Sequence, residues 1–164
     1  MAKRGQMQLS FNFIVAIILI VAAIGVAFYV ITVFLGLGEC SEMGLFYRDL
    51  ESAVDKAWQA EITERVFTGV VPGEVEQVCF GSLEELPRTG FSEQYQFLKR
   101  YGSHGVNVFL YPEGGACDGE LSRHNVEHVA PSGLFCVPVS EGKVEVGLEK
   151  GTFDSEVQWK NVGG

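Results

Sequence analysis

An unbroken apolar stretch runs from Leu9 to Leu37, LSFNFIVAIILIVAAIGVAFYVITVFLGL. It contains no Asp, Glu, Lys, Arg, His or Pro, and the nearest charges on either side are Arg4 and Glu39. A bilayer core needs roughly 20 apolar residues in a helix, so this stretch is long enough to span a membrane with some tilt. A core helix of a soluble domain would be shorter and would carry a polar face. The pattern predicts a transmembrane helix over residues 9–37.

Residues 39–62, which follow this stretch, keep the spacing of a helix but gain a polar face. Apolar residues recur every three or four positions and charged residues fill the others, which predicts an amphipathic helix with one buried side. Glycines at the junction weaken the helix there, so we expect a single long helix with a weak point. The apolar positions are Met43, Phe46, Leu50, Val54, Ala57 and Trp58, and the charged positions are Arg48, Asp49, Glu51, Asp55 and Lys56.

The rest of the chain has the alternation and the turn signals of an antiparallel sheet. Residues 143–149 (KVEVGLE) alternate apolar and polar side chains, as a strand with one buried face does. Tight turns at 140–142 and 150–152 separate this strand from its neighbours, so the last three strands predict a meander. A short helix is predicted over residues 91–101. The predicted strands cover residues 74–80, 106–111, 134–139, 143–149 and 153–159.

These elements together predict an α+β fold in which the amphipathic helix packs on an antiparallel β-sheet. The predicted organisation is a basic N-terminus (residues 1–8), a transmembrane helix (9–37), a helix extension outside the membrane (38–66) and a sheet domain (67–164). The physical reason is that the apolar stripe of the helix must be covered, and the sheet supplies the cover.

Charge is distributed unevenly around the apolar stretch. Only Lys3 and Arg4 among the 12 basic residues precede it, and all 21 acidic residues follow it. Short basic flanks stay on the cytoplasmic side during insertion, so the N-terminus is expected inside and the acidic domain outside the cell membrane. An acidic surface argues against binding to nucleic acid or to anionic lipid headgroups. We favour the simpler interpretation of this charge, a solvated acidic face that keeps the domain soluble.

A cleaved secretory signal is an alternative explanation of the apolar stretch. Its basic start fits, but the apolar core of a secretory signal covers only about 7 to 15 residues. This stretch is far longer, and Gly36-Leu37-Gly38 is a poor substitute for a small-x-small cleavage site. The sequence therefore favours an anchor that is retained.

The residues just before the span carry a more specific motif. Lys3-Arg4-Gly5-Gln6, followed by an uninterrupted apolar helix, resembles the class III signal of archaeal type IV pilin-like proteins. In that family a membrane peptidase cuts after the glycine on the cytoplasmic side and leaves the helix attached to the domain. The resemblance implies cleavage between Gly5 and Gln6 and a pilin-like fold. The alternative is an uncleaved single-span anchor whose Lys3 and Arg4 only set the topology.

A second resemblance covers more of the chain. The KRGQ start, the Val78-Cys79-Phe80 strand and the Phe135-Cys136-Val137 strand are similar to those of small archaeal membrane proteins of unknown function. This resemblance implies a topology and a compartment but no activity. It is compatible with the pilin-like interpretation.

The four cysteines all follow the predicted span. Four cysteines allow three pairings, and the sequence alone does not choose among them. We prefer Cys79 with Cys136, because both lie in apolar strand-like runs that can become neighbours, and Cys40 with Cys117. An extracytoplasmic location favours disulfides. Four reduced cysteines, two of them buried as small hydrophobes, are the alternative.

His124 and His128 are the candidate metal ligands. If residues 120–129 were helical, the spacing of four would place both imidazoles on one side, as zinc ligands can be. No HExxH or CxxC motif accompanies them, so a surface turn with solvated histidines is the other interpretation. No catalytic motif is present, and we expect no enzyme and no cofactor.

Two functions from different classes remain open. The first is a non-enzymatic structural or interaction protein, such as a pilin-like subunit of a cell-surface assembly. Its partners would be the lipid bilayer, other membrane or surface proteins, and further copies of itself in a filament. The second is an anchored ectodomain that binds a metal or small ligand through His124 and His128, with hydrolysis as a conceivable activity.

Overall fold

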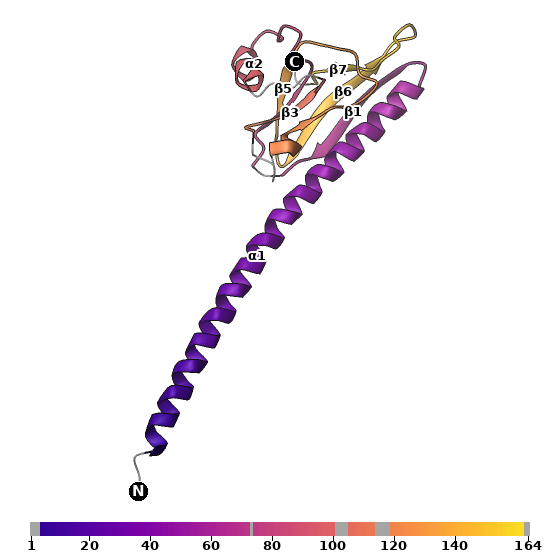
Figure 1. Cartoon of the computed structure of the whole chain (residues 1–164). Helices are drawn as coiled ribbons and strands as arrows, with labels where there is room; N and C mark the ends of the chain where they lie inside the picture. The colour runs from indigo at the N-terminus through magenta and orange to yellow at the C-terminus, as the bar shows by residue number, and fades with distance from the viewer. Residues whose placement is uncertain (1–3, 73, 101–104, 114–118, 163–164) are drawn as a thin grey trace. The chain divides into compact units, whose positions relative to one another are not determined.

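A computed structural model describes residues 4–72, 74–100, 105–113 and 119–162 (Figure 1). The chain divides into two compact units, Met1–Gly38 and Glu39–Gly164. The helix α1 (Arg4–Gln59) contributes to both units. The other elements, all in the second unit, are β1 (Thr63–Val70), β2 (Gln77–Phe80), α2 (Ser92–Lys99), β3 (Val108–Tyr111), the 3₁₀ turn η1 (Gly119–Ser122), β4 (Arg123–His124), β5 (Phe135–Pro138), β6 (Lys143–Lys150) and β7 (Gln158–Lys160).

The first unit is helical and apolar. Its segment Phe11–Phe34 has 24 residues and a mean hydropathy of 3.1, and none of it is buried within the protein. By length and composition this helix is able to cross a membrane, and it is the one such helix among the described residues. The prediction of a single candidate span near the N-terminus is confirmed to that extent.

The part of α1 in the second unit buries the predicted apolar stripe. Five side chains at helical spacing are at most 2% exposed, whereas Trp58 is 37% exposed. The helix ends at Gln59, so the predicted extension to residue 66 is corrected. Residues 63–70 form the strand β1, which lies beside α1 in Figure 1. The five buried residues are Met43, Phe46, Leu50, Val54 and Ala57.

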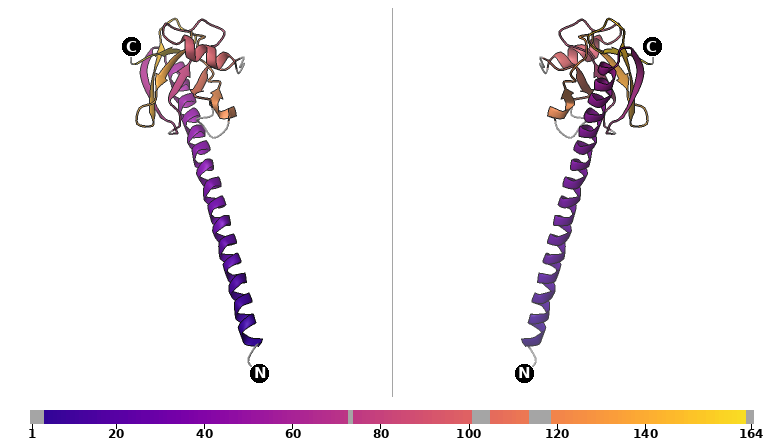
Figure 2. Two further views of the ribbon diagram at one scale, coloured as in Figure 1. Left: turned by 90° about the vertical axis from the view of Figure 1, so that its left-hand side faces the viewer. Right: turned by 90° about the vertical axis from the view of Figure 1, so that its right-hand side faces the viewer.

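Two antiparallel sheets complete the second unit (Figure 2). The three-stranded sheet has the order β1-β6-β7, and the four-stranded sheet has the order β4-β3-β2-β5. The predicted meander of the last three strands is therefore wrong, because β5 pairs with β2 instead of β6. The composition of β5 fits this placement, since Phe135, Cys136 and Val137 are all buried. A strand that is buried on both faces belongs inside a layered structure and not in a half-solvated meander.

The four-stranded sheet has a hydrophobic cluster on each face. Its larger cluster joins the sheet to the stripe of α1 and to the inner face of the three-stranded sheet through residues such as Phe80, Phe135 and Val146. A smaller cluster lies on the side of α2. Alternate residues of one strand enter the two clusters, because successive side chains of a strand point to opposite faces. The smaller cluster contains Cys79, Leu83, Tyr95, Leu98, Phe109, Leu134 and Cys136.

The predicted strand over residues 153–159 is shorter than expected. Only its last part enters β7, while Phe153 is fully exposed in the preceding turn. The side chain of Asp154 accepts a hydrogen bond from the backbone N–H of Gly151 at 2.8 Å, which closes this turn. Aspartate commonly stabilises turns in this way, and here that contact replaces strand pairing.

Candidate functional site

The predicted disulfide between Cys79 and Cys136 is present. The two residues are register partners on the neighbouring strands β2 and β5, with their Cα atoms 3.9 Å apart. Both are at most 4% exposed, and Tyr95 and Leu98 of α2 belong to the same cluster. A covalent bond thus joins the inner strand β2 to the edge strand β5 beneath a helix. Its position indicates a structural role, because both residues are buried in a hydrophobic cluster.

Two other predicted sites remain predictions. Cys117 lies outside the described residues, so its pairing with Cys40 is not part of the described structure. None of the described cysteines is a free thiol. Gly5 and Gln6 belong to the first turns of α1, and cleavage between them remains a prediction.

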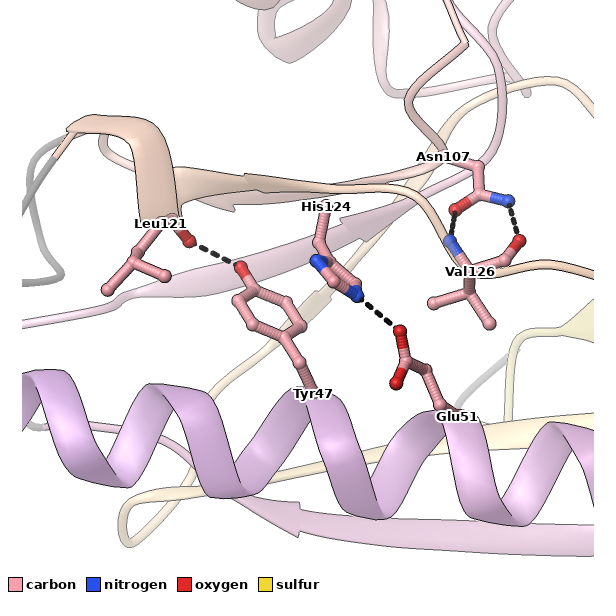
Figure 3. Close-up of polar contacts among 6 residues, drawn as sticks. All are labelled: Tyr47, Glu51, Asn107, Leu121, His124 and Val126. Carbon is pink, nitrogen blue, oxygen red and sulfur yellow. Dashed lines mark hydrogen bonds and ion pairs between the residues drawn. The ribbon is translucent and has the colours of Figure 1, made fainter.

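His124 contacts two residues of α1 (Figure 3). Its ring stacks on Tyr47, with the centroids 4.2 Å apart, and its Nε2 donates a hydrogen bond to Oε1 of Glu51 at 2.8 Å. The hydroxyl of Tyr47 donates to the carbonyl oxygen of Leu121 at 2.6 Å. Burial raises the pKa of Tyr47 well above its ordinary value, so the phenol stays protonated and remains a donor.

His128 lies against a different part of the same helix. Its ring is stacked on Trp58, with the centroids 3.9 Å apart and the planes within 8° of parallel. The indole Nε1 of Trp58 in turn donates to the carbonyl oxygen of Ser155 at 3.0 Å. The backbone of His128 is left-handed, with φ of 65°, in a turn that follows β4. This turn directs the imidazole onto the indole.

The two histidines do not form a joint metal site. Their aromatic partners Tyr47 and Trp58 are eleven positions apart on α1, which corresponds to about 16 Å along a helix. The segment between the histidines is a strand and a turn, so the helical face considered from the spacing is not formed. No group of three or more potential metal ligands occurs among the residues that the structure describes. The geometry gives both rings a packing role.

Asn107 fixes the same segment from its other side. Its side-chain amide donates to the carbonyl oxygen of Val126 at 2.8 Å and accepts from the N–H of Val126 at 2.8 Å (Figure 3). This pair of bonds imitates one rung of a β-ladder at a point where β4 has ended. The segment over residues 119–130 is therefore held both by α1 and by the four-stranded sheet.

A surface depression of 780 Å³ lies between the start of α2 and the start of β6. The amide of Gln94 donates weakly to Gln77, at 3.4 Å, and its Oε1 is buried with no hydrogen-bond partner among the described residues. Lys143 and Glu145 also line the depression. The Oε1 atom of Gln94 could accept one hydrogen bond from a ligand in this depression. The residues that line it do not define a reaction or a class of ligand.

No protein-family model matches the chain, and neither a curated protein nor a solved structure matches it. The fold and the described residues define a class by themselves: an α+β domain with a buried disulfide, preceded by one apolar helix able to span a membrane. Any more specific assignment of function depends on the residues of this chain.

Proposed function

We propose that the protein is anchored by a single membrane span and acts outside the cytoplasm as a structural or interaction protein, in the manner of a pilin-like subunit. The observation that carries this proposal is the exposure of the apolar helix. Side chains such as Phe28 and Phe34 are 68% and 70% exposed, and the described protein covers none of the segment. A surface of this size and composition is unstable in water and needs lipid or other apolar helices around it.

Two further features support an extracytoplasmic domain. Lys3 and Arg4 precede the helix, and positive flanks favour the cytoplasmic side. The Cys79–Cys136 disulfide belongs to the domain that follows, and disulfides persist in oxidising compartments outside the cytosol. Both features give the same orientation, although they arise from unrelated physical causes.

We expect protease added to intact native cells to digest the domain. The peptide bonds of its exposed turns, such as the turn at Phe153, would be accessible from outside, while the apolar helix would remain in the bilayer. Immunoblotting of the membrane fraction with an antibody against the C-terminal strands measures the loss of the full chain. A cytoplasmic protein that stays intact in the same cells is the control. Full protection of the domain in intact cells, followed by digestion after permeabilisation, would place it inside and contradict the proposal.

The pilin-like form of the proposal makes a separate prediction about processing. If the KRGQ start is a class III signal, the mature protein begins at Gln6 and has lost Lys3 and Arg4. The loss of these charges removes the strongest cytoplasmic anchor, which would allow the helix to pack beside other helices in a filament. An anchored receptor has no reason to lose them, because they hold its end inside.

Sequencing the N-terminus of the protein from its native membrane measures this directly. The expected first residue is Gln6, and a Gly5→Val variant is expected to keep the full N-terminus because the bulky side chain occupies the position before the cleaved bond. A Lys3→Arg variant, which preserves the charge, serves as the matched control and should be processed normally. A native start at Met1 or Ala2 would remove the pilin-like interpretation and leave a single-span anchored interaction domain.

A further inference from the structure

The strand β1 has one edge without a partner among the described residues. It lies at the end of the sheet order β1-β6-β7 and pairs only with β6. The backbone N–H of Val71 donates to Gly142, and these two residues continue the register of the β1–β6 ladder. Hydrogen-bonded pairs alternate along an antiparallel ladder, so the odd-numbered residues of β1 bond β6. The outward-directed backbone groups therefore belong to Glu64, Val66, Thr68 and Val70.

A groove runs along this free edge, between β1 and α1. It consists of two depressions of 310 Å³ and 260 Å³ that share Asp49 and Thr68. Leu45 on the helix side is 46% exposed, and Phe67 on the strand side is half-buried. The residues that line the first part are Glu42, Leu45, Phe46, Asp49, Thr68, Gly69 and Val70. Those that line the second part are Asp49, Ala53, Lys56, Arg65, Val66, Phe67, Thr68 and Leu148. Figure 1 shows β1 and α1 side by side along this length.

The dimensions of the groove match an extended chain. On the strand side it follows residues 65–70, which is about 17 Å at the rise of a strand. On the helix side it follows residues 42–56, which is about 21 Å at the rise of a helix. One added strand of about six residues would pair with the free edge and place alternate side chains against Leu45 and Ala53.

The charges at the two ends of the groove have opposite signs. Glu42 lies at the end next to Val70, whereas Asp49, which both depressions share, lies between the two ends and pairs with its neighbour Arg48 at 2.8 Å. Lys56 and Arg65 lie at the other end. Both pairs in this sheet are antiparallel, and antiparallel pairing is slightly more stable than parallel pairing. An antiparallel guest would therefore carry basic residues at its start and acidic residues at its end.

We propose that this groove binds an extended segment of a partner protein, which adds to the sheet as an antiparallel strand with a basic start and an acidic end. This proposal rests on the proposed function, because it names the surface through which an interaction protein would act. Strand addition draws affinity from backbone hydrogen bonds and specificity from alternate side chains. The described edge strands of a second copy lack this charge order. The strand β1 has Glu64 and Arg65 adjacent at its start, β4 has two residues and no acidic one, β5 carries no charge, and β7 carries one lysine at its end.

The test uses the full chain in detergent micelles and two fluorescent peptides of the same composition. One peptide alternates threonine and valine with two lysines at its start and two glutamates at its end, and the other has the charges exchanged. Fluorescence anisotropy is expected to show binding of the first peptide at least about tenfold tighter than binding of the second. Equal affinities would overturn the proposal, because they would show adhesion to exposed apolar residues without orientation.

A proline in the edge separates strand addition from side-chain contact. Thr68→Pro removes an outward N–H but leaves the bonds to β6 in place, and proline is tolerated on an edge strand in this arrangement. The variant is expected to weaken binding of the first peptide by at least about tenfold, while the matched Thr68→Ala variant binds as the native chain does. Near-ultraviolet circular dichroism checks that both variants are folded. Unchanged binding by a folded Thr68→Pro variant would overturn the proposal.

Exchange of the charges gives a second test that does not alter the backbone. The double variant Glu42→Lys, Arg65→Glu is expected to remove the preference between the two peptides, because the retained Asp49 and Lys56 offset the two new charges. An unchanged preference in the folded double variant would overturn the proposal. If Thr68→Pro instead abolished self-association of the native chain in sedimentation, the occupant would be a second copy and the proposal would be overturned. None of these binding results depends on membrane orientation or on processing of the N-terminus. The protease and N-terminal sequencing experiments can therefore fail while the binding results stand, and the reverse also holds.

Discussion

Replacement of both Cys79 and Cys136 by alanine is expected to lower the free energy of unfolding of the second unit by about 4 kcal/mol. The two residues are separated by 57 positions, and a cross-link over a loop of this length strongly restricts the unfolded chain. The sulfurs also fill part of the cluster beneath α2, with both residues at most 4% exposed, so their removal leaves unfilled space as well. Alanine avoids the additional cost of burying a hydroxyl group.

Denaturant unfolding of the full chain in detergent, followed by the fluorescence of Trp159 in a Trp58→Phe background, measures this loss. Trp159 is 2% exposed and packs on Phe80, so its emission reports the core directly. Cys40→Ser is the comparison, and we expect it to cost less than Cys79→Ser because Cys40 lies in α1 and not in the sheet strands that form the core. A double alanine variant as stable as the native chain, or a larger loss for Cys40→Ser, would contradict this account of the core.

Features that depend on one local pattern could be predicted from the sequence. The stripe of α1 from Met43 to Ala57 repeats at the period of a helix, and burial follows directly from that spacing. The Cys79–Cys136 bridge could be predicted because both cysteines lie in short apolar runs, which become adjacent buried strands. The apolar stretch indicated a span by its length alone.

The strand β1 could not be predicted because its apolar residues are divided between its two faces. Its inner face carries Arg65 and Gly69 together with Phe67, while Val66 and Val70 point outward and are 55% and 58% exposed. A sequence pattern indicates a half-buried strand only when the apolar residues share the buried face. Pairing with β6 decides the conformation here, and that pairing joins residues about 80 positions apart.

The contacts of the histidines were missed for a similar reason. The spacing of four between His124 and His128 suggested a shared metal site. Each imidazole instead stacks on a residue of α1 that is 70 or more positions away in the sequence. Tyr47 and Trp58 carry no signal of this role, because both also fit the helical pattern of the stripe. Only the antiparallel pairing of β4 with β3 brings the segment back over α1.

Leu50→Ala is expected to destabilise the second unit by about 3–4 kcal/mol. Leu50 is fully buried at the middle of the stripe, where α1 meets the larger hydrophobic cluster. Truncation removes the transfer free energy of the side chain and leaves a cavity that a helix packed against sheets cannot easily close. The same denaturant unfolding measures the effect.

Leu45→Ala is the matched control, since it makes the same chemical change on the same helix at a position that is 46% exposed. We expect it to change the free energy of unfolding by less than about 1 kcal/mol. A large difference between the two variants would mean that residues 39–59 are part of the core and not a linker to it. Any fragment that begins after Gln59 would then expose the Val144, Val146 and Leu148 face of β6, and would lose the domain together with the helix. Equal effects of the two substitutions would contradict the packing described here.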